Sequence, residues 1–278
     1  MKLDKSRRSR NVEDRRGRGP SRGMVGGGIG ALLVLVIASL IGIDPGALEG
    51  VIPSNEPATP YDPTTGDAEG EFVSIVLGET ELTWNTIFQQ SGGDYREPTL
   101  VMFTGAVQSA CGFAQAAVGP FYCPADEKVY LDTSFFDDLS TRFGAPGDFA
   151  RAYVIAHEVG HHVQNLIGIS SEVHRLRSSV SQEQANQLSV LQELQADCFA
   201  GVWAHFAEQQ RNILEEGDVQ EGLGAASAVG DDRLQMQSQG YVVPESFTHG
   251  SSGQRQEWFA RGYQTGSIND CDTFASLR

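Results

Sequence analysis

The stretch that most constrains the fold is residues 157–161, which read His-Glu-Val-Gly-His. Residues four apart on an α-helix share one face, so His157 and His161 can grip a single metal ion. Glu158 is directed into the same cleft, where it can take a proton from a water molecule that the metal activates. Apolar residues recur at helical spacing through this stretch, so we predict a helix here, with Asp148 capping its start. The alternative is an exposed helix that carries two solvated histidines.

A second segment, Glu-Leu-Gln-Ala-Asp at residues 193–197, lies in a proline-free and strongly helical run. A catalytic zinc ion takes three protein ligands and keeps a fourth position open, so Glu193 is predicted to complete a His, His, Glu set for Zn2+. Asp197 lies one turn further on, where it can accept a hydrogen bond from a ligand histidine. Small residues such as Ala196 and Gly201 suit two helices that press together around a metal. The alternative for both carboxylates is an ordinary solvated helix face.

These residues resemble those of the gluzincin metallopeptidases, in which a glutamate on the helix after the zinc helix is the third ligand. More closely, residues 71–271 resemble the bacterial "putative neutral zinc metallopeptidase" family. The resemblance implies a zincin-like fold, a zinc cofactor and peptide or protein substrates. It also implies that an edge strand within residues 123–132 lies over the metal and pairs with an extended substrate. Further matching stretches are Ser109-Ala110-Cys111-Gly112, Phe121-Tyr122-Cys123-Pro124, Val129-Tyr130-Leu131-Asp132 and Thr248-His249-Gly250-Ser251-Ser252.

The expected reaction is amide hydrolysis, with Glu158 as the general base that later delivers the proton to the leaving amine. His249 lies among turn-forming residues and is predicted to stabilise the oxyanion, with Tyr130 as a weaker candidate. The alternative for His249 is a histidine at a helix start. Two other functions stay open: a catalytically silent zinc-binding membrane scaffold, against which the intact Glu158 argues, and a zinc hydrolase of a non-peptide amide or ester. The other histidines are expected at the surface or in the core: His162, His174 and His205.

The first 23 residues hold nine Lys/Arg against three Asp/Glu, and an uncharged, mostly apolar stretch follows up to residue 43. Such a stretch can cross a bilayer core about 30 Å thick at about 1.5 Å per residue. Because basic flanks stay in the cytoplasm, residues 1–23 are predicted to be a cytoplasmic tail, residues 24–43 a single-pass cell-membrane anchor, and the rest extracytoplasmic. A cleaved signal peptide is the alternative, although the basic leader is long for one. Proline-rich residues 44–70 are expected to form a flexible linker.

Residues 71–278 suit one domain. They carry the acidic excess behind the chain's formal net charge of −16, which argues against nucleic acid as a partner. The four cysteines all lie on the predicted outer side, where two disulfides are expected. Three pairings are open. We favour Cys111 with Cys123, which would close a short loop, and Cys198 with Cys271, which would tie the C-terminus to the ligand helix. The oligomeric state is not indicated.

The hydrophobic periodicity predicts a mostly helical α+β domain with a small β-sheet. Strands are expected at residues 99–104 and 128–131. Helices are expected at residues 71–90, 134–143, 148–167, 181–210, 219–235 and 252–265.

Overall fold

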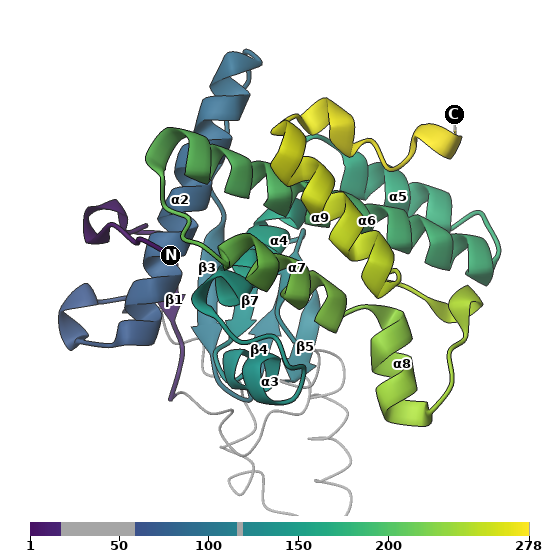
Figure 1. The fold of residues 1–278 in the computed structure, drawn as a ribbon, viewed down its shortest axis with the longest axis horizontal. Coiled ribbons are helices and arrows are strands. Elements are labelled where there is room, and N and C mark those ends of the chain that lie inside the picture. The colour runs from purple at the N-terminus through teal and green to yellow at the C-terminus, as the bar shows by residue number, and fades with distance from the viewer. Residues whose placement is uncertain (18–58, 116–118, 278) are drawn as a thin grey trace, which may run out of the picture.

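The computed structural model describes residues 1–17, 59–115 and 119–277, which form a mostly helical α+β arrangement (Figure 1). The fold class predicted from periodicity is thereby confirmed. The strands are β1 (Val12–Asp14), β2 (Thr59–Pro60), β3 (Thr99–Phe103), β4 (Ala106–Ser109), β5 (Gly112–Gln115), β6 (Phe121–Cys123) and β7 (Lys128–Asp132). The α-helices are α2 (Ala68–Gln90), α3 (Phe135–Thr141), α4 (Asp148–Leu166), α5 (Ile169–Arg177), α6 (Gln182–Arg211), α7 (Asp218–Ala228), α8 (Asp231–Gln239) and α9 (Ser252–Thr265).

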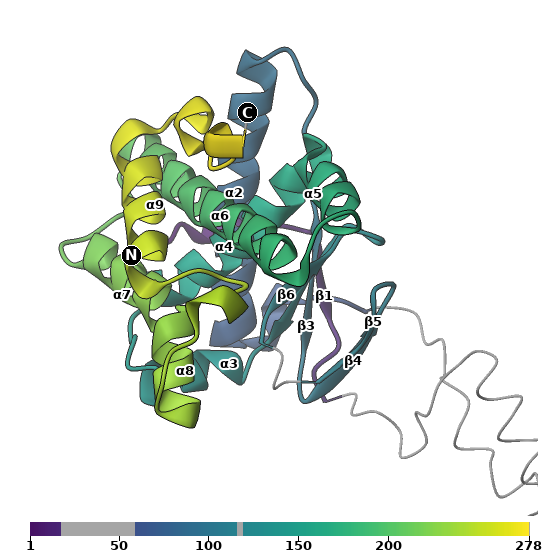
Figure 2. The ribbon, with the colours of Figure 1, turned by 90° about the vertical axis from the view of Figure 1, so that its right-hand side faces the viewer.

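The main sheet has the strand order β2-β1-β3-β7-β6, and β4 pairs with β5 in a separate hairpin. Strand β3 is covered on both faces, which explains its unbroken apolar sequence. Leu100 and Met102 join the large core with the helices, whereas Val101 and Phe103 join a smaller core with Val107 of the hairpin. Figure 2 shows the hairpin on the side of the sheet away from α6 and α9.

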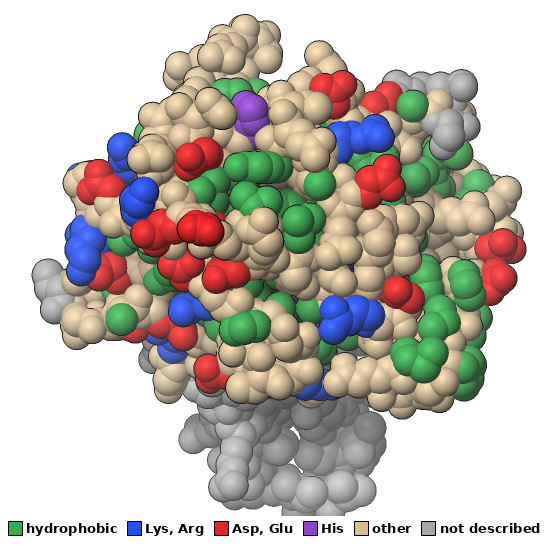
Figure 3. Space-filling model, in the orientation of Figure 1, with side chains coloured by type: hydrophobic (Ala, Val, Ile, Leu, Met, Phe, Trp, Pro, Cys, Tyr) green, Lys and Arg blue, Asp and Glu red, His purple; other side chains and the backbone are tan. Residues whose placement is uncertain are grey.

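Residues 1–17 belong to the same domain as the rest of the sheet. Strand β1 pairs in parallel with β3 and antiparallel with β2. Several basic side chains of this segment face acidic partners in α2: Lys5 Nζ lies 2.8 Å from Glu71, and Arg7 lies 3.0 Å from Glu79. Figure 3 shows acidic and basic side chains side by side at the left of the molecule, where the N-terminal segment lies. For residues 1–17 the prediction of a separate basic tail is wrong, because these charges complement the acidic domain.

This pairing also bears on the expected topology. A single crossing by residues 24–43 would put β1 and β3 on opposite sides of a membrane, whereas their hydrogen-bonded ladder requires both on one side. The predicted anchor itself lies outside the described residues. Within the described ranges, no helix combines the length and the apolar character that a membrane span needs.

The predicted linker also ends earlier than expected. Strand β2 lies in the sheet, and the ring of Tyr61 packs against the large core. Asp67 caps α2 by accepting a hydrogen bond from the backbone N–H of Glu69, 3.1 Å away. Residues 59–70 are therefore part of the domain, because β1 supplies the partner strand that their own composition does not reveal.

Two local expectations about the helices are corrected. Asp148 is the first residue of α4 rather than its cap, and the carboxylate of Glu221 in α7 accepts the N–H of Phe149 instead. The helix expected at residues 219–235 is two helices, α7 and α8, separated at Gly230. The break places Asp231 at the start of α8, where its carboxylate accepts the backbone N–H groups of residues 248–250. Long-range bonds of this kind leave no trace in local periodicity.

Both favoured disulfides are confirmed. Cys111, at the turn of the β4–β5 hairpin, is bonded to Cys123 of strand β6. Cys198 of α6 is bonded to Cys271 near the C-terminus. No cysteine in the described part of the chain is free. The first bond holds the hairpin against the edge of the sheet, and the second holds the C-terminal segment against the ligand helix.

Helices α6 and α9 approach each other through small residues. A Cβ atom added at Gly262 would lie 1.9 Å from the carbonyl oxygen of Cys198. Glycine is required there because any side chain would enter the backbone of the opposite helix.

We expect Gly262→Ala to lower the free energy of unfolding by about 1–3 kcal/mol, the usual cost of overpacking. Gly253→Ala is the matched control: it lies in the same helix, and a Cβ atom there meets nothing within 4 Å. The control should be neutral or slightly stabilising, because alanine favours helix. Urea unfolding of the two zinc-loaded proteins measures the difference, and equal midpoints would mean that the helices can separate at little cost.

Candidate metal centre

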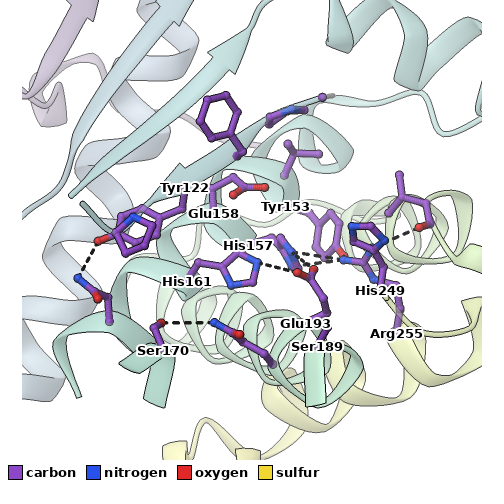
Figure 4. Close-up of a pocket in the computed structure, with 18 of the residues that line it drawn as sticks. Tyr122, Tyr153, His157, Glu158, His161, Ser170, Ser189, Glu193, His249 and Arg255 are labelled. Carbon is purple, nitrogen blue, oxygen red and sulfur yellow. Dashed lines mark hydrogen bonds and ion pairs between the residues drawn. The ribbon is translucent and has the colours of Figure 1, made fainter. Parts of the chain in front are cut away.

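The three predicted ligands converge from two neighbouring helices. His157 and His161 project from α4, and Glu193 projects towards them from α6 (Figure 4). The Nε2 atom of His157 lies 3.2 Å from one carboxylate oxygen of Glu193, and the Nε2 atom of His161 lies 3.4 Å from the other. The helical spacing therefore puts both imidazoles on one face, as the sequence predicts.

The donor set fits zinc. Ligand atoms of the three side chains all lie within 4.8 Å of one another. Tetrahedral zinc with bonds of about 2.0–2.2 Å places neighbouring ligand atoms roughly 3.3 Å apart, close to the spacing of these side chains. Two imidazoles and one carboxylate also leave the fourth position that a catalytic zinc ion keeps for water or substrate.

Each ligand histidine is oriented through its other ring nitrogen. The Nδ1 atom of His157 lies 2.8 Å from Asp197, and that of His161 lies 2.9 Å from the side-chain oxygen of Gln164. The side-chain amide nitrogen of Gln164 donates to the Gln192 carbonyl, which leaves its oxygen free to accept from His161. Both partners accept, so Nδ1 carries the hydrogen and the Nε2 lone pair faces the metal position.

Gly160, inside the motif, sets the distance between the two helices. A Cβ atom there would lie 2.9 Å from the carbonyl oxygen of Ala196 in α6. Ala196 therefore lies at the predicted contact between the two ligand helices, whereas Gly201 faces the backbone of Phe259 in α9 instead. The close approach of the ligand helices is what allows Glu193 to reach both imidazoles.

Asp197 is completely buried, and its carboxylate has three side-chain partners. It accepts hydrogen bonds from His157, from the Tyr153 hydroxyl and from Arg255, whose Nε lies 2.8 Å away. Burial acts to raise the pKa of Asp197, but the charges and hydrogen bonds of Arg255 and His157 together outweigh burial and hold that pKa below its ordinary value. Asp197 is therefore a charged acceptor, and Arg255 compensates its charge.

The sequence reasoning missed Tyr153, Gln164 and Arg255. Tyr153 lies four residues before His157, so the spacing that pairs the two histidines also places it on their face. Gln164 lies three residues after His161 on the same helix. Arg255 carries no local signal, because only the packing of α9 against α6 brings it to Asp197.

A cavity of about 980 Å³ opens over the metal position. Glu158 is buried in its wall, and burial raises the pKa of this carboxyl group above its ordinary value. Phe121 and Tyr122 of β6 line the same cavity. The free edge of the described sheet beside the site is therefore β6, whereas β7 lies between β3 and β6. Of the predicted edge segment, residues 123–132, only Cys123 belongs to that edge strand.

His249 lies in the wall of the cavity, in the loop before α9, and is half exposed. Its Nδ1 atom lies 3.1 Å from Asp231, whose carboxylate also accepts three N–H groups of residues 248–250. The hydrogen bond to Asp231 raises the pKa of His249. Tyr130, the weaker candidate for the same role, donates to Asp126 and is buried in the small core, away from the cavity.

The remaining histidines lie where they were expected. His162 is buried, and its Nε2 atom lies 2.6 Å from the Arg96 carbonyl oxygen. His205 donates to the Tyr263 carbonyl oxygen at 2.7 Å. His174 is exposed on the cavity wall. None of the three joins the ligand cluster.

We expect Asp197→Asn to weaken zinc binding about 10- to 100-fold, because the amide keeps the shape of the acceptor and loses its charge. Competition with a zinc-chelating dye measures the affinity. Asp132→Asn is the control, since Asp132 is also fully buried and serves a turn near the hairpin. If Asp197→Asn keeps the wild-type affinity and loses only thermal stability, Asp197 is a structural residue.

Comparison with known proteins adds a family match. The model of a family described as "Putative neutral zinc metallopeptidase" matches residues 1–274, a range that includes β1. The chain is 49% identical over 284 residues to "Uncharacterized protein YpfJ" of Escherichia coli K12, covering 99% of each chain. It is 42% identical over 255 residues to "Uncharacterized protein Mb2605" of Mycobacterium bovis, covering 86% of this chain and 85% of the relative. No solved structure matches.

Proposed function

The chain belongs to the "putative neutral zinc metallopeptidase" family, and we propose that it is an active peptidase that hydrolyses peptide bonds with Glu158 as general base. Zinc is the cofactor that this family implies, and His157, His161 and Glu193 are the residues that would hold it. The observation that carries the proposal is the position of Glu158, buried in the wall of the cavity that the ligand side chains also line. A site that only stores zinc has no use for a general base there.

When bound, zinc supplies a Lewis acid that activates water and polarises a carbonyl group. Glu158 takes the proton from the attacking water and then delivers it to the leaving nitrogen. Its raised pKa suits this role, because a carboxyl group that both accepts and returns a proton works best near the working pH. His249 donates a hydrogen bond to the carbonyl oxygen as negative charge develops on it.

The shape of the cavity favours a polypeptide over a small amide or ester. Strand β6 forms part of the wall, and its side away from β7 has no partner strand among the described residues. Backbone groups on such an edge can pair with an extended peptide, which recognises main chain rather than one particular side chain. A cavity of about 980 Å³ also exceeds what a single amino-acid side chain fills.

The test compares zinc-loaded wild-type protein with Glu158→Gln on a peptide library prepared from a bacterial proteome. Mass spectrometry of new peptide termini identifies the cleavages. Termini that appear only with the wild type support the proposal. Equal sets of termini from both proteins, or none from either at full zinc occupancy, contradict it; hydrolysis of model esters alone would favour a non-peptide hydrolase.

The pH dependence should report on His249. Because Asp231 only accepts, Nδ1 of His249 carries the hydrogen, and the neutral ring has no proton left on Nε2. Donation from Nε2 therefore needs the protonated ring, so activity falls as the pH rises through the raised pKa of His249. In Asp231→Asn that pKa drops, and the falling limb of the kcat/KM profile should move to lower pH. A limb that does not move would remove His249 from the mechanism.

We propose that the domain works outside the cytoplasm. The support is its two disulfides, which persist in oxidising compartments. The support for attachment to a membrane is the uncharged, mostly apolar sequence of residues 24–43. Because β1 pairs with β3, residues 1–17 would then lie on the same side of the membrane as the metal centre.

Membrane-impermeant maleimide added to intact spheroplasts tests this arrangement. Lys2→Cys and Glu183→Cys each offer an exposed thiol, the first before β1 and the second at the start of α6. Labelling of both supports the proposal. Labelling of Glu183→Cys alone would mean that residues 1–17 lie in the cytoplasm. Labelling of neither variant before lysis, and of both after lysis, would mean that the whole domain lies inside the cell.

A further inference from the structure

The cationic side chains of the domain differ in whether a carboxylate lies beside them. In the described residues after residue 59, most Lys and Arg side chains lie within 3.8 Å of a carboxylate. Arg96, for example, pairs with Glu127 at 2.7 Å, and Lys128 pairs with Glu13 at 2.6 Å. Arg151 instead stacks on the aromatic rings of the core. The arginines that remain are Arg142, Arg177 and Arg233.

These remaining arginines all line the cavity over the metal position or a second hollow that shares Arg142 and Phe143 with it. Arg177, at the end of α5, is exposed in the cavity wall and has no ion pair within the described residues. Arg142 follows α3, and its nearest carboxylate, on the exposed Asp138, is 4.0 Å away. Arg142 also lines the adjoining hollow of about 480 Å³ together with Arg233. Among the described residues, the side chain of Arg233 makes one hydrogen bond, to the Ser227 hydroxyl at 3.3 Å.

The arginines lie at the two ends of the site. Helix α5 carries Arg177, and Arg142 directly follows α3. Figures 1 and 2 both show α5 and α3 on opposite sides of α4, the helix that carries the two ligand histidines. A chain that crosses the metal position therefore meets an exposed guanidinium group at each end: Arg177, which has no ion pair among the described residues, and Arg142, which has only the exposed Asp138 at 4.0 Å.

In a chain with a formal net charge of −16, carboxylates to pair with an arginine are plentiful. Arg177 and Arg233 have no carboxylate partner among the described residues, and Arg142 has only a long, exposed contact with Asp138, so these guanidinium groups are available to a ligand whose carboxylate matches their planar fork of donors. We propose that the cleft binds carboxylate groups through Arg177 at one end and through Arg142 with Arg233 at the other. The proposal rests on the peptidase function and names its substrate class, which is acidic peptides. The carboxylates come either from Asp and Glu side chains or from the C-terminus of the substrate.

The probes are internally quenched decapeptides with six randomised central residues and two Glu, Gln or Lys residues on each flank, all with amidated C-termini. A further Gln-flanked set has a free C-terminal carboxylate. Cleavage is measured for the zinc-loaded full chain as wild type, Arg177→Gln and the double variant Arg142→Gln/Arg233→Gln. Arg175→Gln is the matched control, because Arg175 lies on the same helix as Arg177 and pairs with Glu172.

We expect the wild type to prefer Glu-flanked over Lys-flanked peptides by at least about fivefold in kcat/KM, and each arginine variant to raise KM for them about two- to fivefold, as for exposed ion pairs. The control should behave as wild type. A preference confined to free C-termini would support the proposal and identify the terminal carboxylate as the ligand. Equal use of Glu- and Lys-flanked peptides, or a preference that no arginine variant reduces, would overturn it.

Binding separates this proposal from the proposed activity. Anisotropy of fluorescein-labelled Glu-flanked peptides, titrated with zinc-loaded Glu158→Gln protein, measures affinity without turnover. Arginine-dependent binding with no cleavage by the wild type would contradict the peptidase function and leave the carboxylate site standing. Cleavage with no dependence on flanking charge would contradict the carboxylate site and leave the peptidase function standing. Added salt should weaken the preference, because the pairs are exposed.

Discussion

His161→Ala is expected to emerge from purification without zinc. The remaining ligands, His157 and Glu193, cannot hold a catalytic zinc ion that needs three protein donors. The loss of zinc affinity should exceed the roughly 10- to 100-fold that is typical when a residue hydrogen-bonded to a metal ligand is replaced. The stabilisation of the fold by bound zinc should vanish as well. That stabilisation is about 4 kcal/mol when the free zinc concentration exceeds the Kd 1,000-fold. Metal analysis by mass spectrometry and thermal unfolding with and without added zinc measure the two effects.

His174→Ala is the matched control for that experiment, because His174 lies exposed on the wall of the same cavity and outside the ligand cluster. It should retain one zinc ion per chain. Full zinc occupancy in His161→Ala would contradict the ligand assignment. Loss of zinc from both variants would indicate that the metal site responds to any change in the cavity.

The parts of the site that the sequence predicts are those fixed by helix geometry. The four-residue spacing of His157 and His161 determines a shared face once the segment is helical. The same holds for Glu193 and Asp197 on α6, and small residues such as Gly160 mark where the two helices meet. These inferences need only one helix at a time and an assumption that the two helices touch.

The parts that the sequence misses depend on contacts between distant segments. Arg255 reaches Asp197 across 58 positions of the chain, and Asp231 holds the loop of His249 from 18 positions away. Strand β1 has three residues and a charged sequence, so nothing local distinguishes it from a tail. Its strand character comes from β3, which supplies the hydrogen bonds.

The basic leader shows how one charge pattern serves two physical roles. Lys and Arg before an uncharged stretch are typical of a cytoplasmic flank. They are equally suited to neutralise an acidic surface, and Lys5 and Arg7 do so at Glu71 and Glu79. Composition cannot separate these roles, because both need positive charge and differ only in where the partner lies.

Glu158→Gln is expected to keep its zinc and to lose about 10²- to 10⁴-fold in kcat, the usual effect of removing a general base. The amide has nearly the shape of the carboxylate, so the ligand side chains stay in place, but it cannot take a proton from water. Burial raises the pKa of Glu158, which favours the protonated form that would deliver a proton to the leaving nitrogen, whereas glutamine can neither take up nor release that proton. The exposed Glu257→Gln is the control and should retain both zinc and activity. Turnover by Glu158→Gln at the wild-type rate would exclude this residue as the base, whereas loss of zinc along with turnover would make it part of the metal-binding set. Retained zinc with lost turnover is the one combination that separates catalysis from metal storage, since a silent zinc scaffold would not respond to this change at all.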